Sequence, residues 1–103
     1  MMEKRTFILQ LREGMQEEYK RRHRDIWPEM LQMLHNAGIR NYPIWLYEDK
    51  LFGYYESENL FKTEAHKVAS KVQMRWNSYM EDVIFPLALY SKGNQPECVF
   101  NMK

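Results

Sequence analysis

The sequence predicts a single α+β domain over residues 1–103, with strands and helices in the order β-α-β-β-α-β, the ferredoxin-like pattern. Two observations support this class. The chain has the length of one domain, and segments with strand-like alternation are separated by segments with the 3.6-residue apolar repeat of helices. In this pattern two helices cover one face of a four-stranded sheet.

The first strand and a broken helical region occupy the N-terminal third. Apolar side chains alternate over residues 6–11, which predicts a strand. After a glycine, residues 15–24 form a charged segment that we expect to be helical. Pro28 lacks the N–H group that a helix interior requires, so it suits the first turn of a second helical segment, 28–36. Gly38 is placed to end that segment as its C-terminal cap.

Two further strands and a long helix follow. Residues 39–47 and 51–56 are rich in aromatic and β-branched side chains, and the three residues between them suit a hairpin loop. From Asn59 onward the 3.6-residue period returns as one apolar stripe, which predicts a single helix. The members of the stripe are Ala65, Val68, Ala69, Val72, Trp76, Tyr79, Met80 and Val83. A short last strand is predicted at 98–102, after a loop at 91–96.

Both faces of the middle strands are apolar. The alternating sets in the second strand are Tyr42, Ile44 and Leu46 against Pro43, Trp45 and Tyr47. Helices are expected on one face only, and an uncovered face this aromatic would be a sticky patch on a monomer. We therefore expect a second copy of the chain to cover it, which predicts a homodimer.

Composition excludes several classes of function. The formal net charge is +1, from 15 basic and 14 acidic residues, which provides no basic field for nucleic acid. No apolar run approaches membrane-spanning length, and the N-terminus lacks the apolar core of a signal peptide. Cys98 is alone and cannot form an internal disulfide, and no spacing of side chains suggests a metal site. These features predict a soluble, cytoplasmic protein without a metal.

A strongly charged stretch, EEYKRRHRDIWPEM at residues 17–30, holds the most informative side chains. Tyr19 and His23 are four residues apart, so on a helix they share one face. An imidazole titrates near neutral pH, which suits it to accept and donate protons. On spacing alone, a solvated histidine in the basic run 20–24 remains the simpler interpretation. The other basic side chains of this run, Lys20, Arg21, Arg22 and Arg24, are expected on a solvated face.

The same stretch closely resembles the N-terminal signature of the L-rhamnose mutarotases, small enzymes that interconvert the anomers of a 6-deoxy sugar. Further similarities follow in order, from about residue 7 to residue 83. They are Asn41-Tyr42, Leu51-Phe52, Arg75-Trp76 and Tyr79-Met80. The resemblance implies a dimeric α+β barrel built from two such sheets, and a redox-neutral reaction on a monosaccharide that needs no metal, nucleotide or other cofactor.

The resemblance also implies roles for particular residues. His23 matches the general acid of the family and is expected to carry the proton. Tyr19 would hydrogen-bond a sugar oxygen or orient the imidazole, Tyr42 matches a sugar-contacting tyrosine, and Trp76 would stack on the sugar. From the residues alone, packing in the helix, sheet or core remains an open alternative for each of these three aromatic side chains.

The chain departs from the family pattern in two places. Family members typically have two adjacent tryptophans, whereas here Asn77 occupies the second position and replaces a stacking ring with a hydrogen-bonding, substrate-binding amide. The Asp-Asn-Ser-Pro stretch of the family is absent from 91–96. A mutarotase for a related 6-deoxy sugar such as L-fucose therefore stays open. So do a cofactor-free monooxygenase, which the same barrel can host, and a non-catalytic sugar-binding module.

Overall fold

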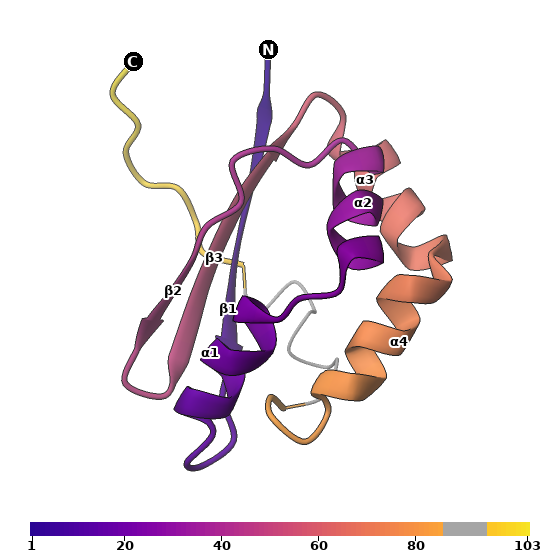
Figure 1. The fold of residues 1–103 in the computed structure, drawn as a ribbon. Coiled ribbons are helices and arrows are strands. Elements are labelled where there is room, and N and C mark those ends of the chain that lie inside the picture. The colour runs from indigo at the N-terminus through magenta and orange to yellow at the C-terminus, as the bar shows by residue number, and fades with distance from the viewer. Residues whose placement is uncertain (86–94) are drawn as a thin grey trace.

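The computed structural model describes residues 1–85 and 95–103, which form one sheet with four helices on one of its faces (Figure 1). The sheet is antiparallel, with strand order β1-β3-β2. The strands are β1 (Glu3–Gln10), β2 (Ile44–Tyr47) and β3 (Lys50–Ser57). The helices are α1 (Gln16–Arg24), α2 (Pro28–Asn36), α3 (Leu60–Ala69) and α4 (Lys71–Met80). The α+β class predicted from the sequence is confirmed, and the arrangement is consistent with a ferredoxin-like fold.

β3 is the central strand, and its register with both neighbours defines the sheet. β1 pairs with β3 from Glu3 opposite Ser57 to Gln10 opposite Lys50. β2 and β3 form a hairpin in which Tyr47 pairs with Lys50. Since paired residues of antiparallel strands share a face, this register sends one set of side chains toward the helices and the other set away from them.

β2 is shorter than predicted. The predicted strand covered 39–47, whereas the pairing of β2 begins at Ile44 and one isolated bridge to β3 precedes it. Asn41 has a φ of 52°, in the left-handed region, and Pro43 has no N–H to donate to a neighbouring strand. The backbone therefore leaves the extended conformation before the proline and enters the strand only after it.

The single long helix predicted after Asn59 is in fact two helices, α3 and α4. Ser70 separates them with an extended backbone, and its hydroxyl accepts a hydrogen bond from the Gln73 N–H at 3.2 Å. Serine in this conformation is a favourable N-cap. The apolar period continues across the break, but Val68 before it is 75% exposed whereas Trp76 after it is buried. The predicted apolar stripe therefore packs in the core along α4 but not along α3.

The prediction of a last strand at 98–102 is wrong, since these residues form no strand and are exposed. A strand needs a hydrogen-bonded neighbour, and none of the described residues supplies one to this segment, which Figure 1 shows extending away from the sheet. Within the described residues, Phe85 contacts the edge of β1 that faces away from β3, near the end of the strand. Its N–H donates to the Gln10 carbonyl oxygen at 3.1 Å. Most of the predicted loop 91–96 lies outside the described residues.

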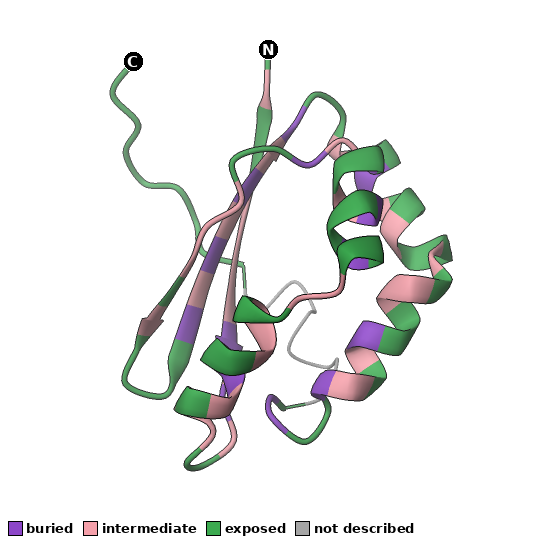
Figure 2. Ribbon diagram, in the orientation of Figure 1, coloured by how far each residue is buried: buried purple, intermediate pink, exposed green. Residues whose placement is uncertain are grey.

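The core fills the space between the sheet and the helices, and none of the described helices covers the other face of the sheet (Figure 2). The most buried apolar side chains of the core are Leu11, Leu51, Tyr55, Met80 and Val83. On the uncovered face, Trp45 and Tyr47 are 58% and 67% exposed. Within the described residues, no helix is long and apolar enough to cross a membrane.

Candidate active site

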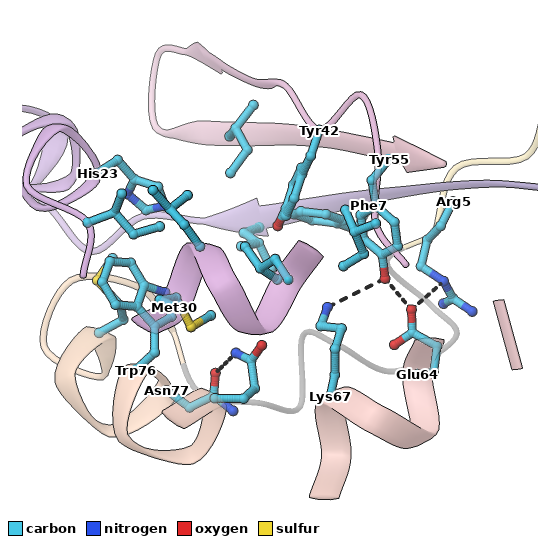
Figure 3. Close-up of a pocket in the computed structure, with 18 of the residues that line it drawn as sticks. Arg5, Phe7, His23, Met30, Tyr42, Tyr55, Glu64, Lys67, Trp76 and Asn77 are labelled. Atoms are coloured by element: carbon cyan, nitrogen blue, oxygen red, sulfur yellow. Dashed lines mark hydrogen bonds and ion pairs between the residues drawn. The ribbon is translucent and has the colours of Figure 1, made fainter. Parts of the chain in front are cut away.

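A cavity of about 400 Å³ lies between the sheet and the helices (Figure 3). This volume falls within the range of small-molecule sites. The walls come from both layers, since α1, α4 and the loop before β2 all contribute side chains. All five residues predicted for the site line this one cavity: Tyr19, His23, Tyr42, Trp76 and Asn77.

His23 lies in the last turn of α1 and is held by the backbone of its own helix. Its Nδ1 is 3.1 Å from the carbonyl oxygen of Tyr19. Because a carbonyl oxygen only accepts, Nδ1 carries a hydrogen and donates it, and Nε2 of the neutral ring keeps its lone pair. Burial lowers the pKa of His23 below its ordinary 6.5, and the hydrogen bond to the Tyr19 carbonyl opposes this effect. At neutral pH the resting imidazole is therefore an uncharged base.

Aromatic rings enclose the imidazole of His23. The Tyr19 ring stacks on it, with centroids 4.1 Å apart and an interplanar angle of 25°, as expected for residues four apart on a helix. The Trp76 ring meets the imidazole edge-on at 5.3 Å, and Trp27 lies 5.2 Å beyond Trp76. These rings keep water from the imidazole, which is the physical cause of its lowered pKa.

Tyr42 and Asn77 reach the cavity from different layers. Tyr42 lies in the loop before β2, and its ring centroid is 6.1 Å from that of Phe7 and 5.0 Å from that of Tyr55. Asn77 lies in α4, and its Oδ1 accepts a hydrogen bond from Gln73 Nε2 at 2.8 Å. This pair of amides forms a polar wall at the position where the family pattern has a second tryptophan.

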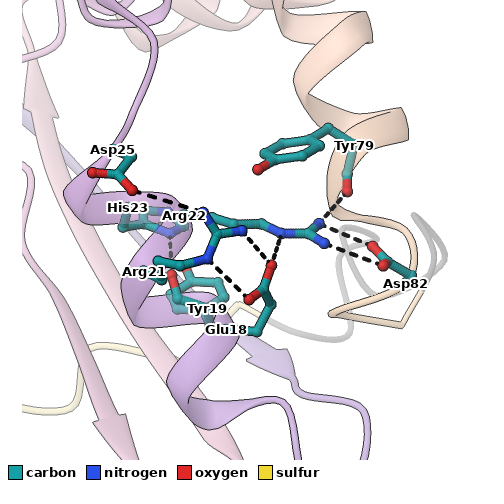
Figure 4. Close-up of polar contacts among 8 residues, drawn as sticks. All are labelled: Glu18, Tyr19, Arg21, Arg22, His23, Asp25, Tyr79 and Asp82. Atoms are coloured by element: carbon teal, nitrogen blue, oxygen red, sulfur yellow. Dashed lines mark hydrogen bonds and ion pairs between the residues drawn. The ribbon is translucent and has the colours of Figure 1, made fainter.

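Arg22 joins α1 to the end of α4 (Figure 4). Its Nε donates to Glu18 at 2.7 Å, and its Nη1 donates to the Tyr79 carbonyl oxygen at 2.5 Å and to Asp82 at 2.9 Å. Its side chain is only 11% exposed. With its basic neighbours this arginine was expected on a solvated face, and for Arg22 that expectation is wrong, because the arginine anchors the helix that carries His23.

A second set of polar side chains, which sequence reasoning missed, closes the other end of the cavity. We call Arg5, Tyr55, Glu64 and Lys67 the far polar group. The Tyr55 hydroxyl donates to Glu64, and Arg5 Nε lies 3.2 Å from the same carboxylate oxygen. Lys67 Nζ lies 3.4 Å from the Tyr55 hydroxyl oxygen. The spacing of Glu64 and Lys67 on one helix face was visible, but nothing in the sequence placed that face against the sheet.

The groups that line the cavity suit proton transfer and hydrogen bonding. Among residues 1–85 and 95–103, no three His, Cys, Asp or Glu side chains lie close enough together to hold a metal ion. The cavity presents instead the imidazoles of His23 and His35, together with amides, phenols and charged side chains. Such groups exchange protons with hydroxylated ligands and bind their oxygens.

A small α+β domain with a neutral histidine base, enclosing rings and hydrogen-bonding walls defines an acid–base site for a small hydroxylated ligand. The sequence pattern of one known family, L-rhamnose mutarotase, matches residues 4–102. The chain belongs to the L-rhamnose mutarotase family.

Individual members of the family resemble the chain over most of its length. The L-rhamnose mutarotase of Paraburkholderia xenovorans is 38% identical over 104 residues, which cover 98% of this chain and 96% of that protein. The L-rhamnose mutarotase of Sinorhizobium fredii is 42% identical over 89 residues, 81% of each chain. The crystal structure of an L-rhamnose mutarotase from Formosa agariphila matches with a TM-score of 0.83 and 26% identity, over 98% of this chain and 99% of that one.

Proposed function

We propose that this protein is an isomerase that interconverts the α- and β-anomers of L-rhamnose by acid–base opening and closing of the sugar ring. The observation that carries the proposal is the neutral imidazole of His23, with its Nδ1 held by the backbone, in a cavity of suitable size. Membership of the L-rhamnose mutarotase family supports the choice of sugar. The relatives from Paraburkholderia xenovorans and Sinorhizobium fredii carry the same name.

One proton carrier is sufficient for this reaction. Nε2 of His23 removes the proton from the anomeric hydroxyl, a C=O double bond forms at C1, and the bond between C1 and the ring oxygen breaks. The imidazolium then gives the same proton to the ring oxygen. Its lowered pKa favours this second transfer, because burial disfavours the charged ring. Rotation about the C1–C2 bond and the reverse steps give the other anomer.

The remaining predicted residues would bind the sugar. Tyr19 orients the imidazole by stacking on it, and Trp76 and Tyr42 provide aromatic surfaces for the C–H face of the ring. Asn77 would hydrogen-bond a sugar hydroxyl in place of the second tryptophan of the family. That departure favours, as a second candidate, a related 6-deoxy sugar such as L-fucose.

Saturation-transfer NMR on the two anomers tests the proposal directly. Irradiating one anomeric signal of L-rhamnose should reduce the other when the protein is present, because only a mutarotase accelerates their exchange. A sugar-binding module would leave the exchange at its uncatalysed rate, and so would a cofactor-free monooxygenase. The same measurement on L-fucose decides between the two sugars.

The lowered pKa of His23 predicts the pH dependence of the exchange. The base must be neutral to accept a proton, so the catalysed rate should fall as pH drops through the pKa of His23, with a midpoint below 6.5. The folded protein binds this proton less readily than the unfolded chain, so the contribution of His23 to stability is complete above about pH 6.5 and declines below it. Rates from pH 4.5 to 8, corrected for the uncatalysed reaction, check this. If the catalysed rate fell with a midpoint above pH 6.5, the imidazole of His23 would not be desolvated as described.

We further propose that the protein is a homodimer joined through the uncovered face of the sheet. Ile8, Phe52 and Trp45 are opposite one another across the three strands and so share this face. With Tyr47 they form an apolar surface of the kind that is usually covered. A second copy would cover it and complete the barrel that the resemblance implies.

Trp45→Glu should convert this dimer to monomers, because each interface would then bury two carboxylates without partners. Analytical ultracentrifugation at micromolar concentration measures the change. Val68→Glu is the matched control, since Val68 is equally apolar and 75% exposed but lies in α3. If the control dissociates the dimer and Trp45→Glu does not, the interface lies on the helices instead.

The chemistry of the single cysteine bears on the compartment in which the protein works. Cys98 is exposed and free, which a reducing environment tolerates better than an oxidising one. We infer that the protein works in the cytoplasm.

A further inference from the structure

The cavity has two chemically different ends, and only one of them takes part in the proposed proton transfer. Figure 3 shows His23 and Trp76 at one end and the far polar group at the other. If His23 acts at C1 and the ring oxygen, the opposite bond of a six-membered sugar ring is the one between C3 and C4. The hydroxyls at C3 and C4 would therefore face the end that contains Lys67.

Lys67 has more N–H donors than the described residues at this end of the cavity accept. An ammonium group carries three N–H donors, and its hydrogen bond to the Tyr55 hydroxyl is long, at 3.4 Å. The Tyr55 proton is committed to Glu64, so this hydroxyl can only accept from the lysine. Among the described residues, no carboxylate lies within 4.0 Å of Lys67 Nζ.

The position of Lys67 is costly for a cation without an ion pair. The side chain is largely withdrawn from water, and desolvation lowers its pKa while the nearby Glu64 opposes that effect. A partly buried charge is stabilised when its hydrogen-bonding capacity is filled. Sugar hydroxyl oxygens would fill it without adding charge.

An unsatisfied acceptor lies on the neighbouring wall. Gln73 Oε1 is buried and has no hydrogen-bond partner among the described residues, while its Nε2 donates to Asn77. A hydroxyl group both donates and accepts, so two neighbouring hydroxyls could accept from Lys67 and donate to Gln73. A vicinal diol carries both functions on neighbouring carbons.

The break at Ser70 is what brings these walls together. On one continuous helix, Lys67 and Asn77 would be about 15 Å apart along the axis and on different faces. The extended backbone at Ser70 turns α4 relative to α3. Both helices then contribute side chains to the same cavity.

We propose that Lys67, with Gln73, binds the C3 and C4 hydroxyls of the sugar and so determines which 6-deoxyhexose the enzyme accepts. This inference rests on the proposed mutarotase function. It makes Lys67 a specificity-determining residue, because sugars that differ in configuration at C4 place that hydroxyl differently relative to a fixed ammonium group. L-Rhamnose and L-fucose differ in configuration at C4 and also at C2, so the deoxy sugars are needed to isolate the contact at C4.

The test removes the Lys67 ammonium group, then one sugar hydroxyl, and then both together. Anomer exchange is measured by NMR for wild type and Lys67→Met on L-rhamnose, 3-deoxy-L-rhamnose and 4-deoxy-L-rhamnose. A hydrogen bond to a charged group predicts that kcat/KM falls about ten- to a hundredfold when either the ammonium or the contacted hydroxyl is removed. Removing both should cost no more than removing one, because the contact is already lost.

Lys62→Met is the matched control, since Lys62 is an exposed lysine of the same helix and does not line this cavity. In the Lys62→Met variant, kcat/KM should still fall when the sugar hydroxyl is removed. Lys67→Gln is a second variant in case Lys67→Met does not fold. The inference is overturned if the two losses multiply, or if wild type is indifferent to both deoxy sugars. Absence of catalysed exchange in wild type on L-rhamnose and L-fucose alike would instead refute the proposed function.

Discussion

Replacing His23 with alanine should slow the catalysed exchange of L-rhamnose anomers by about a hundred- to ten-thousandfold, the usual contribution of a general acid–base group. The imidazole of His23 is neutral at neutral pH because burial lowers its pKa, and its tautomer leaves one ring nitrogen able to accept a proton. Nδ1 is held by the Tyr19 carbonyl at 3.1 Å, which leaves Nε2 as the nitrogen that can accept the proton. Saturation-transfer NMR measures the rate, and circular dichroism checks that the variant is folded.

His66→Ala is the matched control, because His66 is an exposed histidine in α3 outside this cavity, and it should retain the wild-type rate. Added imidazole should partly restore exchange in His23→Ala, since the substitution leaves a space beside the Trp76 ring. Near-normal exchange in a folded His23→Ala protein would show that another group carries the proton.

Trp76→Ala should lower the free energy of unfolding by about 3–5 kcal/mol, the usual cost of truncating a buried aromatic side chain. Trp76 is 8% exposed and packs against His23, Trp27 and Tyr79. For a small domain this is a large share of the total stability. It should also weaken sugar binding, because the ring lines the cavity.

Trp27→Ala separates these two roles. Trp27 packs on the Trp76 ring at 5.2 Å but does not line the cavity. Its loss should destabilise the fold with a smaller effect on KM. Urea unfolding measures stability, and exchange rates at rising L-rhamnose concentration give KM. Equal effects of both substitutions on KM would mean that Trp76 acts through packing alone and does not contact the sugar.

Local pattern predicted most of the elements, and the resemblance to the mutarotases predicted the residues at the His23 end of the cavity. Alternation identified β1 and β3, and the spacing of Tyr19 and His23 predicted a shared face that the stacked rings now show at 4.1 Å. The break at Ser70 was not predictable from periodicity, because the apolar repeat continues on both sides of it. Its signal was the capping preference of a serine, which is weak when the surrounding residues all favour a helix.

The far polar group could not be predicted, because it depends on how separate elements cross. Arg5 and Tyr55 lie on paired strands, whereas Glu64 and Lys67 lie on the helix that packs over them. In the sequence each of these residues has an ordinary alternative as a surface charge or a sheet aromatic. Only the tertiary contacts show that the four side chains share one end of the cavity.

The contacts of Arg22 bear on how a sugar would bind in the cavity. The two walls that meet at His23 and Trp76 belong to α1 and α4, and Arg22 clamps the first to the end of the second through Tyr79 and Asp82. A sugar held between those walls would favour the same closed arrangement that the clamp favours. If the sugar binds only when the two helices are together, its binding and the contacts of Arg22 should stabilise each other by the same free energy.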